Sequence, residues 1–155
     1  MTLPNASFPR SPEAILLAVM RRDPEHSPIY HRRDLNGDGK PENMCNWFAR
    51  DYCGDMSAPI PNALARDQID WLKSPLARLD GWVYPASLTQ AKLAASEGKV
   101  VLVFWRNPNN KESSHIAVMI DGLGHIAQAG RVNFNKGTVG QGFGGVAPIE
   151  FAIHP

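Results

Sequence analysis

The sequence predicts a single domain of the α+β class, with helices in its front part and an antiparallel sheet in its back part. Its 155 residues fit one domain and leave little room for two. Helix-start signals recur before residue 100, whereas continuous or alternating apolar runs dominate after it. Helices followed by an antiparallel sheet define the α+β class.

The helical part carries three recognisable signals. The serine, proline and glutamate at 11–13 supply a capping side chain, a proline at the first helical position and an acid in the first turn, which predicts a helix from there to Met20. Asn62 is expected to cap a helix that ends at Lys73. A capping box at 87–90 predicts a further helix, which Gly98 ends.

The sheet is predicted over about 100–154. Residues 100–105 form a continuous apolar run, typical of a strand buried on both faces. Residues 115–120 and 125–129 flank a turn-forming segment and predict a β-hairpin. Alternation of apolar and polar residues over 149–154 predicts a last strand.

Composition excludes several classes of protein. Sixteen Lys and Arg residues face fifteen Asp and Glu residues, so the formal net charge of +1 argues against a nucleic-acid partner. No apolar run approaches the roughly 20 residues that a membrane-spanning helix needs. Residues 1–5 contain neither a basic nor an apolar region, so we expect no secretory signal peptide.

The two cysteines are predicted to lie in one short helix, over 45–53, that Gly54 stops. Eight helical residues separate their α-carbons by about 12 Å, whereas a disulfide tolerates about 7 Å at most. Cys45 and Cys53 therefore cannot pair, and at least one thiol is free.

Three residue types suit nucleophilic catalysis. Cys45 lies at a helix start, where the helix dipole and free amides are expected to lower the pKa of its thiol. His115 opens a strand after a polar loop and would be the base, and Gln128 on the next strand would orient it. His125 is a rival for that orienting role, but it is expected to face the other side of the sheet. The alternative is that the cysteines are small buried hydrophobes, which is our interpretation of Cys53.

Four segments resemble the NlpC/P60 and CHAP cysteine peptidases and amidases. Residues 44–51 resemble their Cys-x-x-Phe helix, and 59–63 are similar to the stretch that follows it. Residues 114–119 resemble their Gly-His-Val-Ala-Val strand, with serine in place of the glycine. Residues 126–130 resemble the strand with the third polar residue, here glutamine rather than the usual His or Asn. The resemblance spans about residues 40–130.

The resemblance implies a papain-like fold and one catalytic domain over 1–155. Its implied activity is peptidoglycan hydrolysis, in which Cys45 attacks an amide carbonyl, His115 transfers the proton and Gln128 orients His115. The substrate would be a stem peptide or cross-link. A monomeric phage endolysin released through a membrane lesion would fit, and so would an antibacterial effector delivered by a secretion system, with an immunity protein as partner.

Two other functions stay open at this stage. The same fold would serve as a catalytically silent module that binds cell wall or protein, with the four tryptophans as its contact surface (Trp47, Trp71, Trp82 and Trp105). Alternatively, the chain is a cysteine amidase that acts on another amide.

The segment 34–45 matches the opening of a calcium loop, with oxygen-bearing residues at alternate positions and glycine for the sharp turn. Cys45 occupies the position where such loops carry a bidentate glutamate. The expected ligands are Asp34, Asn36, Asp38, the Lys40 carbonyl, Glu42 and water. Some CHAP endolysins are similar in placing such a loop before the nucleophile. A solvated acidic turn is the alternative, and a zinc site at His26, His31 and Asp34 lacks a further nitrogen or sulfur ligand.

Overall fold

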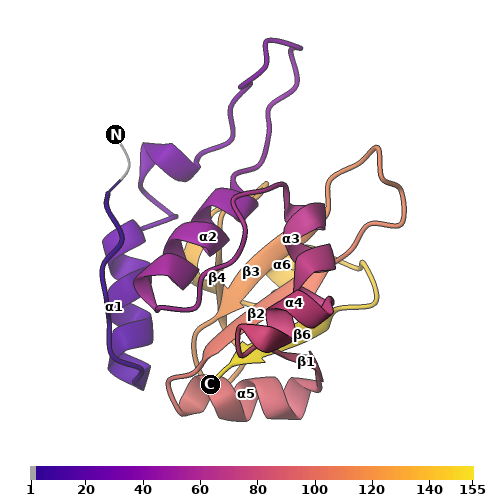
Figure 1. Cartoon of the computed structure of the whole chain (residues 1–155). Helices are drawn as coiled ribbons and strands as arrows, with labels where there is room; N and C mark the ends of the chain where they lie inside the picture. The colour runs from indigo at the N-terminus through magenta and orange to yellow at the C-terminus, as the bar shows by residue number, and fades with distance from the viewer. Residues whose placement is uncertain (1–2) are drawn as a thin grey trace.

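A computed structural model describes residues 3–155 and shows an α+β protein, which confirms the predicted class (Figure 1). Its centre is a six-stranded sheet with the order β1-β6-β2-β3-β4-β5. Every neighbouring pair of strands is antiparallel. The strands are β1 (Val83–Ala86), β2 (Val100–Trp105), β3 (His115–Met119), β4 (Ile126–Gln128), β5 (Phe134–Gly137) and β6 (Glu150–His154).

Helices cover both faces of this sheet. They are α1 (Pro12–Arg22), α2 (Cys45–Asp55), α3 (Ala65–Leu72), α4 (Pro75–Leu79), α5 (Leu88–Ser96) and α6 (Val139–Phe143), with a 3₁₀ turn at Pro28–Tyr30. Alternate residues of β3 point to opposite faces. Ile116 and Val118 pack in the core that α1–α4 complete, whereas Ala117 and Met119 pack in a second core beneath α5 and α6.

Two of the predicted helix starts are confirmed and one is wrong. The Ser11 side chain accepts a hydrogen bond from the Ala14 N–H, and Ser87 forms a complete capping box. Asn62 does not cap α3, which begins at Ala65. Its side-chain oxygen instead accepts a hydrogen bond of 2.7 Å from Arg50. A tertiary partner has thus taken the oxygen that the cap would have used.

The prediction that Gly54 stops helix α2 is wrong, because the helix continues to Asp55. A β-carbon added to Gly54 would lie 2.6 Å from Nδ2 of Asn5, so the glycine allows the N-terminal segment to pass close to the helix. Here the glycine serves packing rather than termination. Both cysteines are free and buried, which confirms that Cys45 and Cys53 do not pair.

A buried ion pair joins the first two long helices. The Asp55 carboxylate, fully buried in α2, accepts hydrogen bonds of 2.6 and 2.8 Å from the Arg22 guanidinium of α1. It also accepts a hydrogen bond of 2.7 Å from the Ala6 N–H. The N-terminal segment, α1 and α2 are therefore held at one point.

Two long loops extend beyond the same end of the molecule (Figure 1). The first leads from the 3₁₀ turn into α2, and the second joins β2 to β3. Within residues 3–155, no helix combines the length and the apolar character needed to cross a membrane.

Candidate active site

Cys45 is the first residue of α2 and is 4% exposed. Met44 precedes it at the cap position and provides no side-chain hydrogen bond to the helix. The first N–H groups of a helix have no partner within the helix itself. At the start of α2 they are therefore free to act on the thiol and on its surroundings.

Burial raises the pKa of the Cys45 thiol to about 11, although the backbone N–H groups of Ile116, Asn46 and Cys45 itself act in the opposite direction. The sequence-based expectation was a lowered pKa. The structure gives the reverse because removal of the thiol from water outweighs these donors. The resting side chain is therefore a neutral thiol whose sulfur lies against the strand at Ile116.

His115 and Gln128 are in direct contact. The Nε2 atom of His115 lies 2.7 Å from Oε1 of Gln128, and Gln128 is 1% exposed. The other end of the same amide donates a hydrogen bond of 2.8 Å to the Val132 carbonyl. Because the amide nitrogen must face that carbonyl, its oxygen faces the imidazole, and Nε2 of His115 must carry a proton. Nδ1 is left as the unprotonated nitrogen.

The imidazole is enclosed from the α6 side of the sheet. The rings of His115 and Phe143 have centroids 4.6 Å apart. Burial lowers the pKa of His115 below its ordinary value, and the hydrogen bond to Gln128 offsets part of this shift. A β-carbon at Gly142 would lie 2.3 Å from Oε1 of Gln128, so only glycine leaves room for the amide. Val132, Gly142 and Phe143 thus enclose the two side chains from this side.

Cys45 reaches the same end of β3 from the other face. Its thiol interacts with the backbone N–H of Ile116, the residue that follows His115. Within the described residues, no direct hydrogen bond joins Cys45 to His115. The structure therefore unites His115 with Gln128 and brings Cys45 to the adjoining backbone.

A pocket of about 250 Å³ opens beside Cys45. Its walls come from the start of α2 with the segment before it, the start of α3, and the β2–β3 loop. The lining residues are Leu35, Glu42, Asn43, Met44, Cys45, Asn46, Trp47, Leu64, Ala65, Arg66, Asn110, Lys111, Glu112, Ser113 and Ser114. The pocket therefore has an apolar rim and carries side chains of both charges.

The two rival residues lie elsewhere. His125 is at the turn between β3 and β4, where its Nδ1 atom lies 2.8 Å from Asp121. Cys53 is completely buried inside α2, away from the pocket. His115 contacts Gln128 and not His125, but the reason differs from the predicted one: His125 lies in the turn before β4 rather than on the opposite face of a strand.

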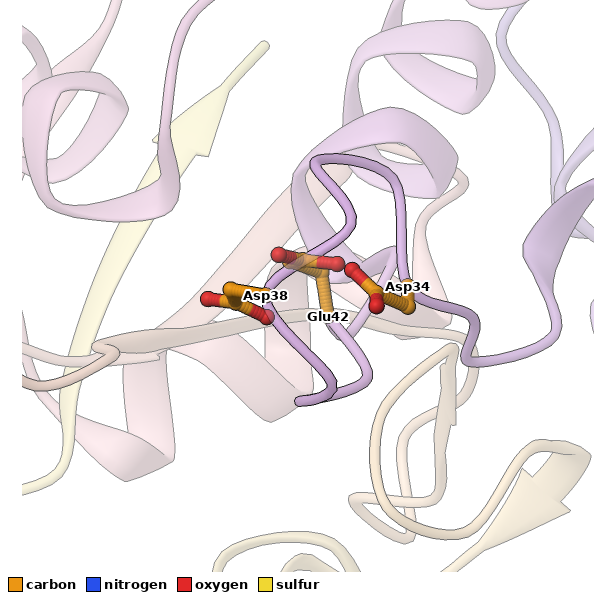
Figure 2. A group of neighbouring side chains, drawn as sticks. All are labelled: Asp34, Asp38 and Glu42. Carbon is orange, nitrogen blue, oxygen red and sulfur yellow. The ribbon is translucent and has the colours of Figure 1, made fainter.

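Three carboxylates gather in the loop before α2, from Asp34, Asp38 and Glu42 (Figure 2). One oxygen from each lies within 4.8 Å of the others. Both oxygens of Asp34 accept backbone hydrogen bonds, of 2.8 Å from Gly37 and 2.7 Å from Gly39. The Gly39 N–H contributes most to lowering the pKa of Asp34. The loop is closed at its base by a bridge between Arg33 and Glu42.

These three carboxylates could hold a metal ion. The two other expected ligands lie in the same loop: Asn36 accepts a 3.1 Å hydrogen bond from the Asp38 N–H, and the Lys40 N–H donates 2.8 Å to Asp38. The zinc alternative is not supported by the described residues. His26 interacts with Asp23 and Glu25 instead of with Asp34.

The four tryptophans do not form a shared exposed surface. Trp82 is 2% exposed, and Trp47 and Trp71 pack against the core beneath α1–α4. Trp105 packs against the opposite core. Trp47 also has the Arg33 and Arg50 guanidinium groups near its ring, at 5.3 and 5.9 Å from its centroid.

Most pocket residues were not anticipated from the sequence, and Asn43 is an example. Asn43 lies two positions before Cys45 and lines the same pocket, but nothing in the local sequence distinguishes it from a polar loop residue. Comparison with models of known protein families gave no match, and a search among curated proteins found no relative. Fold and site geometry are therefore the basis for assigning a function.

Proposed function

We propose that this protein is a papain-like cysteine hydrolase that cleaves an amide bond in peptidoglycan. The observation that carries the proposal is the His115–Gln128 hydrogen bond, because it leaves Nδ1 of His115 as a proton acceptor at the strand end that the Cys45 thiol contacts. A nucleophile, a base and an orienting group beside a pocket are the parts that acyl transfer requires.

The proposed reaction begins with transfer of the Cys45 thiol proton to Nδ1 of His115. The sulfur attacks the amide carbonyl, and a C–S bond forms as the carbonyl becomes a tetrahedral oxyanion. The oxyanion collapses, the C–N bond breaks, and His115 returns its proton to the leaving amine. Water then hydrolyses the thioester, with His115 again acting as the base.

The pKa shifts favour general-base catalysis over a preformed ion pair. Burial raises the pKa of Cys45 and lowers the pKa of His115, so both side chains are neutral near pH 7. Proton transfer then accompanies attack on the carbonyl. Gln128 assists by stabilising the protonated imidazole and holding its orientation.

Peptidoglycan is proposed as substrate because segments 44–51, 114–119 and 126–130 resemble the NlpC/P60 and CHAP enzymes. The pocket is compatible with a short peptide, since its rim includes exposed Leu35 and Leu64 and its walls carry both charges. A phage endolysin and a delivered antibacterial effector both remain compatible with this substrate. A tryptophan-based binding module has no comparable support, because the four rings are dispersed and at least partly buried.

Digestion of purified peptidoglycan, followed by mass spectrometry of the released muropeptides, tests the proposal. We expect the wild-type protein to release fragments whose masses identify one cleaved amide bond. Cys45→Ala should abolish release while circular dichroism stays unchanged. Cys53→Ala is the matched control and should retain most activity, because Cys53 does not line the pocket. Equal loss in both folded variants would contradict the assignment of the nucleophile.

A further inference from the structure

The turn between β4 and β5, residues 129–133, contacts both members of the proposed proton-transfer pair. A β-carbon added to Gly130 would lie 3.1 Å from Cε1 of His115 and 3.4 Å from Nε2 of Gln128, so the backbone of the turn packs closely against both side chains. The Val132 carbonyl of the same turn accepts the 2.8 Å hydrogen bond that directs the Gln128 amide. The orientation of that amide therefore depends on where the turn lies.

The side chain of Asn133 holds this turn in place. Its Oδ1 atom accepts a hydrogen bond of 2.8 Å from the Gly130 N–H. Its Nδ2 atom donates hydrogen bonds of 2.7 Å to the Tyr30 carbonyl and 3.1 Å to the Pro24 carbonyl. The oxygen and both amino hydrogens of this carboxamide are thus engaged. Val132, in contrast, is exposed, so its own side chain provides little buried contact that could fix its carbonyl.

Tyr30 is a firm attachment point for this turn. The residue is buried, and its hydroxyl donates a hydrogen bond of 2.6 Å to Asp51 of α2. Its ring packs edge-on against Phe48 of the same helix, with the ring centroids 5.6 Å apart. Asn133 therefore connects the β4–β5 turn to the helix that begins with Cys45.

We propose that Asn133 is a positioning residue that maintains the Nε2-protonated tautomer of His115. By tying the β4–β5 turn to the Tyr30 carbonyl, it keeps the Val132 carbonyl within reach of the Gln128 amide. This role concerns the state of the imidazole. Its consequence for catalysis rests on the proposed function, in which Nδ1 of His115 receives the proton of the nucleophile.

A loose turn would permit the opposite arrangement of the amide. Without a fixed Val132 carbonyl, the Gln128 carboxamide can turn over and present its amino group to the imidazole. Nε2 of His115 must then accept that hydrogen bond, and the neutral ring carries its proton on Nδ1. An imidazole in this form has no nitrogen free to receive the thiol proton, so the base is lost in proportion to the population of this form.

Nitrogen NMR spectroscopy measures the tautomer directly. Protonated and unprotonated imidazole nitrogens differ strongly in chemical shift, and the signals of His115 are those missing from a His115→Ala variant. Spectra would be recorded at about pH 8, where an imidazole is neutral. We expect the wild-type ring to carry its proton on Nε2. In Asn133→Ala, the ratio of the Nδ1-protonated to the Nε2-protonated form should rise about fivefold or more, the change that loss of one ordinary hydrogen bond produces.

Asn135→Ala is the matched control, because Asn135 binds the same segment as Asn133. It accepts a hydrogen bond of 3.1 Å from the Glu25 N–H and donates one of 2.8 Å to Asp23. Among residues 3–155, however, its side chain forms no hydrogen bond with the β4–β5 turn, so the control should keep the wild-type tautomer ratio. Asn133→Asp retains the acceptor for Gly130 but removes both donors. It should shift the ratio as Asn133→Ala does, and it replaces that variant if alanine prevents folding.

Peptidoglycan digestion gives a second readout. Because Asn133 does not line the pocket, Asn133→Ala should leave KM within about twofold of the wild-type value. It should lower kcat by at least the factor by which it lowers the Nε2-protonated fraction of His115. A variant that merely loosened the fold would not produce this agreement between rate and tautomer.

The two readouts separate this inference from the proposed function. If folded Asn133 variants keep the wild-type tautomer ratio, or if Asn135→Ala shifts it equally, the positioning role is wrong, whatever the activity. A wild-type ring that already carries its proton on Nδ1 would also overturn it. If the ratio shifts only in the Asn133 variants and the wild type releases no muropeptides, the positioning role stands and the proposed function fails.

Discussion

At the residue scale, Gln128 determines the chemical state of His115. Its amide accepts from Nε2 of the imidazole and donates to the Val132 carbonyl, so neither end is free to exchange roles. The Val132 carbonyl therefore fixes the orientation of the Gln128 amide, and that amide in turn fixes the tautomer of His115. A rigid base in the correct tautomer loses less rate to misorientation than a base that rotates freely.

We expect Gln128→Ala to lower turnover by about ten- to a hundredfold and His115→Ala by about a thousandfold or more, because general acid–base catalysis contributes about 10²–10⁴. Loss of Gln128 leaves a base that is misplaced part of the time, whereas loss of His115 removes proton transfer. Steady-state rates of muropeptide release would check both. His125→Ala is the control and should be nearly fully active. If the Gln128→Ala variant is active and the His125→Ala variant is inactive, the orienting role belongs to His125 instead.

The raised pKa of Cys45 predicts an unusual dependence on pH. Because the pKa is about 11, the thiolate fraction rises about tenfold per pH unit below that value. Alkylation of Cys45 by iodoacetamide should therefore accelerate steadily from pH 7 to pH 10. Stopped samples analysed by mass spectrometry would give the rates in the Cys53→Ala background. A rate that levels off below pH 8 would show that a thiolate already exists near neutrality.

At the element scale, the loop that leads into α2 carries three carboxylates. Without a cation, Asp34, Asp38 and Glu42 repel one another, and a bound ion would convert that repulsion into attraction. Glu42 belongs to the cluster and also lines the pocket. Glu42 therefore links the carboxylate cluster to the pocket wall beside Cys45.

We expect millimolar calcium to raise the melting temperature and EDTA to lower it, because binding to the folded state alone adds to stability. Removal of the metal should lower activity. Magnesium should substitute poorly for calcium, because a flexible loop with many oxygen ligands suits the larger ion. The double variant Asp34→Ala, Asp38→Ala should melt at the same temperature in calcium and in EDTA. If calcium changes neither the melting temperature nor the heat measured in a calorimetric titration, the segment is an ordinary acidic turn.

The long elements were predictable from the sequence, whereas several short ones were not. The apolar run at 100–105 became β2 with the same bounds, because a buried strand needs little beyond apolar side chains. β5 and α6 were missed, since their four and five residues include glycines and carry no clear period. The end of α2 was misplaced because contact with Asn5, not local propensity, explains Gly54.

The candidate site was predictable in its residue types but not in its electrostatics. The contact between His115 and Gln128 follows from strand alternation, which a sequence displays directly. The raised pKa of Cys45 depends on how completely the surrounding core excludes water, and that packing is not visible in a local motif. Asn133 escaped notice for the same reason, because only the three-dimensional structure places its side chain against the Tyr30 carbonyl.

At the scale of the whole molecule, the Asp55–Arg22 pair holds the N-terminal segment, α1 and α2 together. Asp55→Ala should lower the free energy of unfolding by about 3–5 kcal/mol, because it removes the closest anionic partner of the buried Arg22 guanidinium and leaves it only Asp51, at 3.9 Å, as a charged partner. Denaturation with urea would measure the change. Glu97→Ala is the control: it removes the exposed Glu97–Lys99 pair, and stability should change by less than about 0.5 kcal/mol. A similar small change in Asp55→Ala would show that α1 and α2 are held mainly by apolar contacts.

The central sheet divides the proposed chemistry between two sides. The pocket and Cys45 belong to the side of α2 and α3, whereas the base and its orienting amide are enclosed by α6. Sequence change on the pocket side can thus leave the His115–Gln128 pair intact. Conversely, Gly142→Ala would displace Gln128 without touching any ionisable group or the pocket wall. If the proposed hydrolase activity is correct, residues that select the substrate and residues that hold the base lie on opposite faces of the sheet and could change independently in evolution.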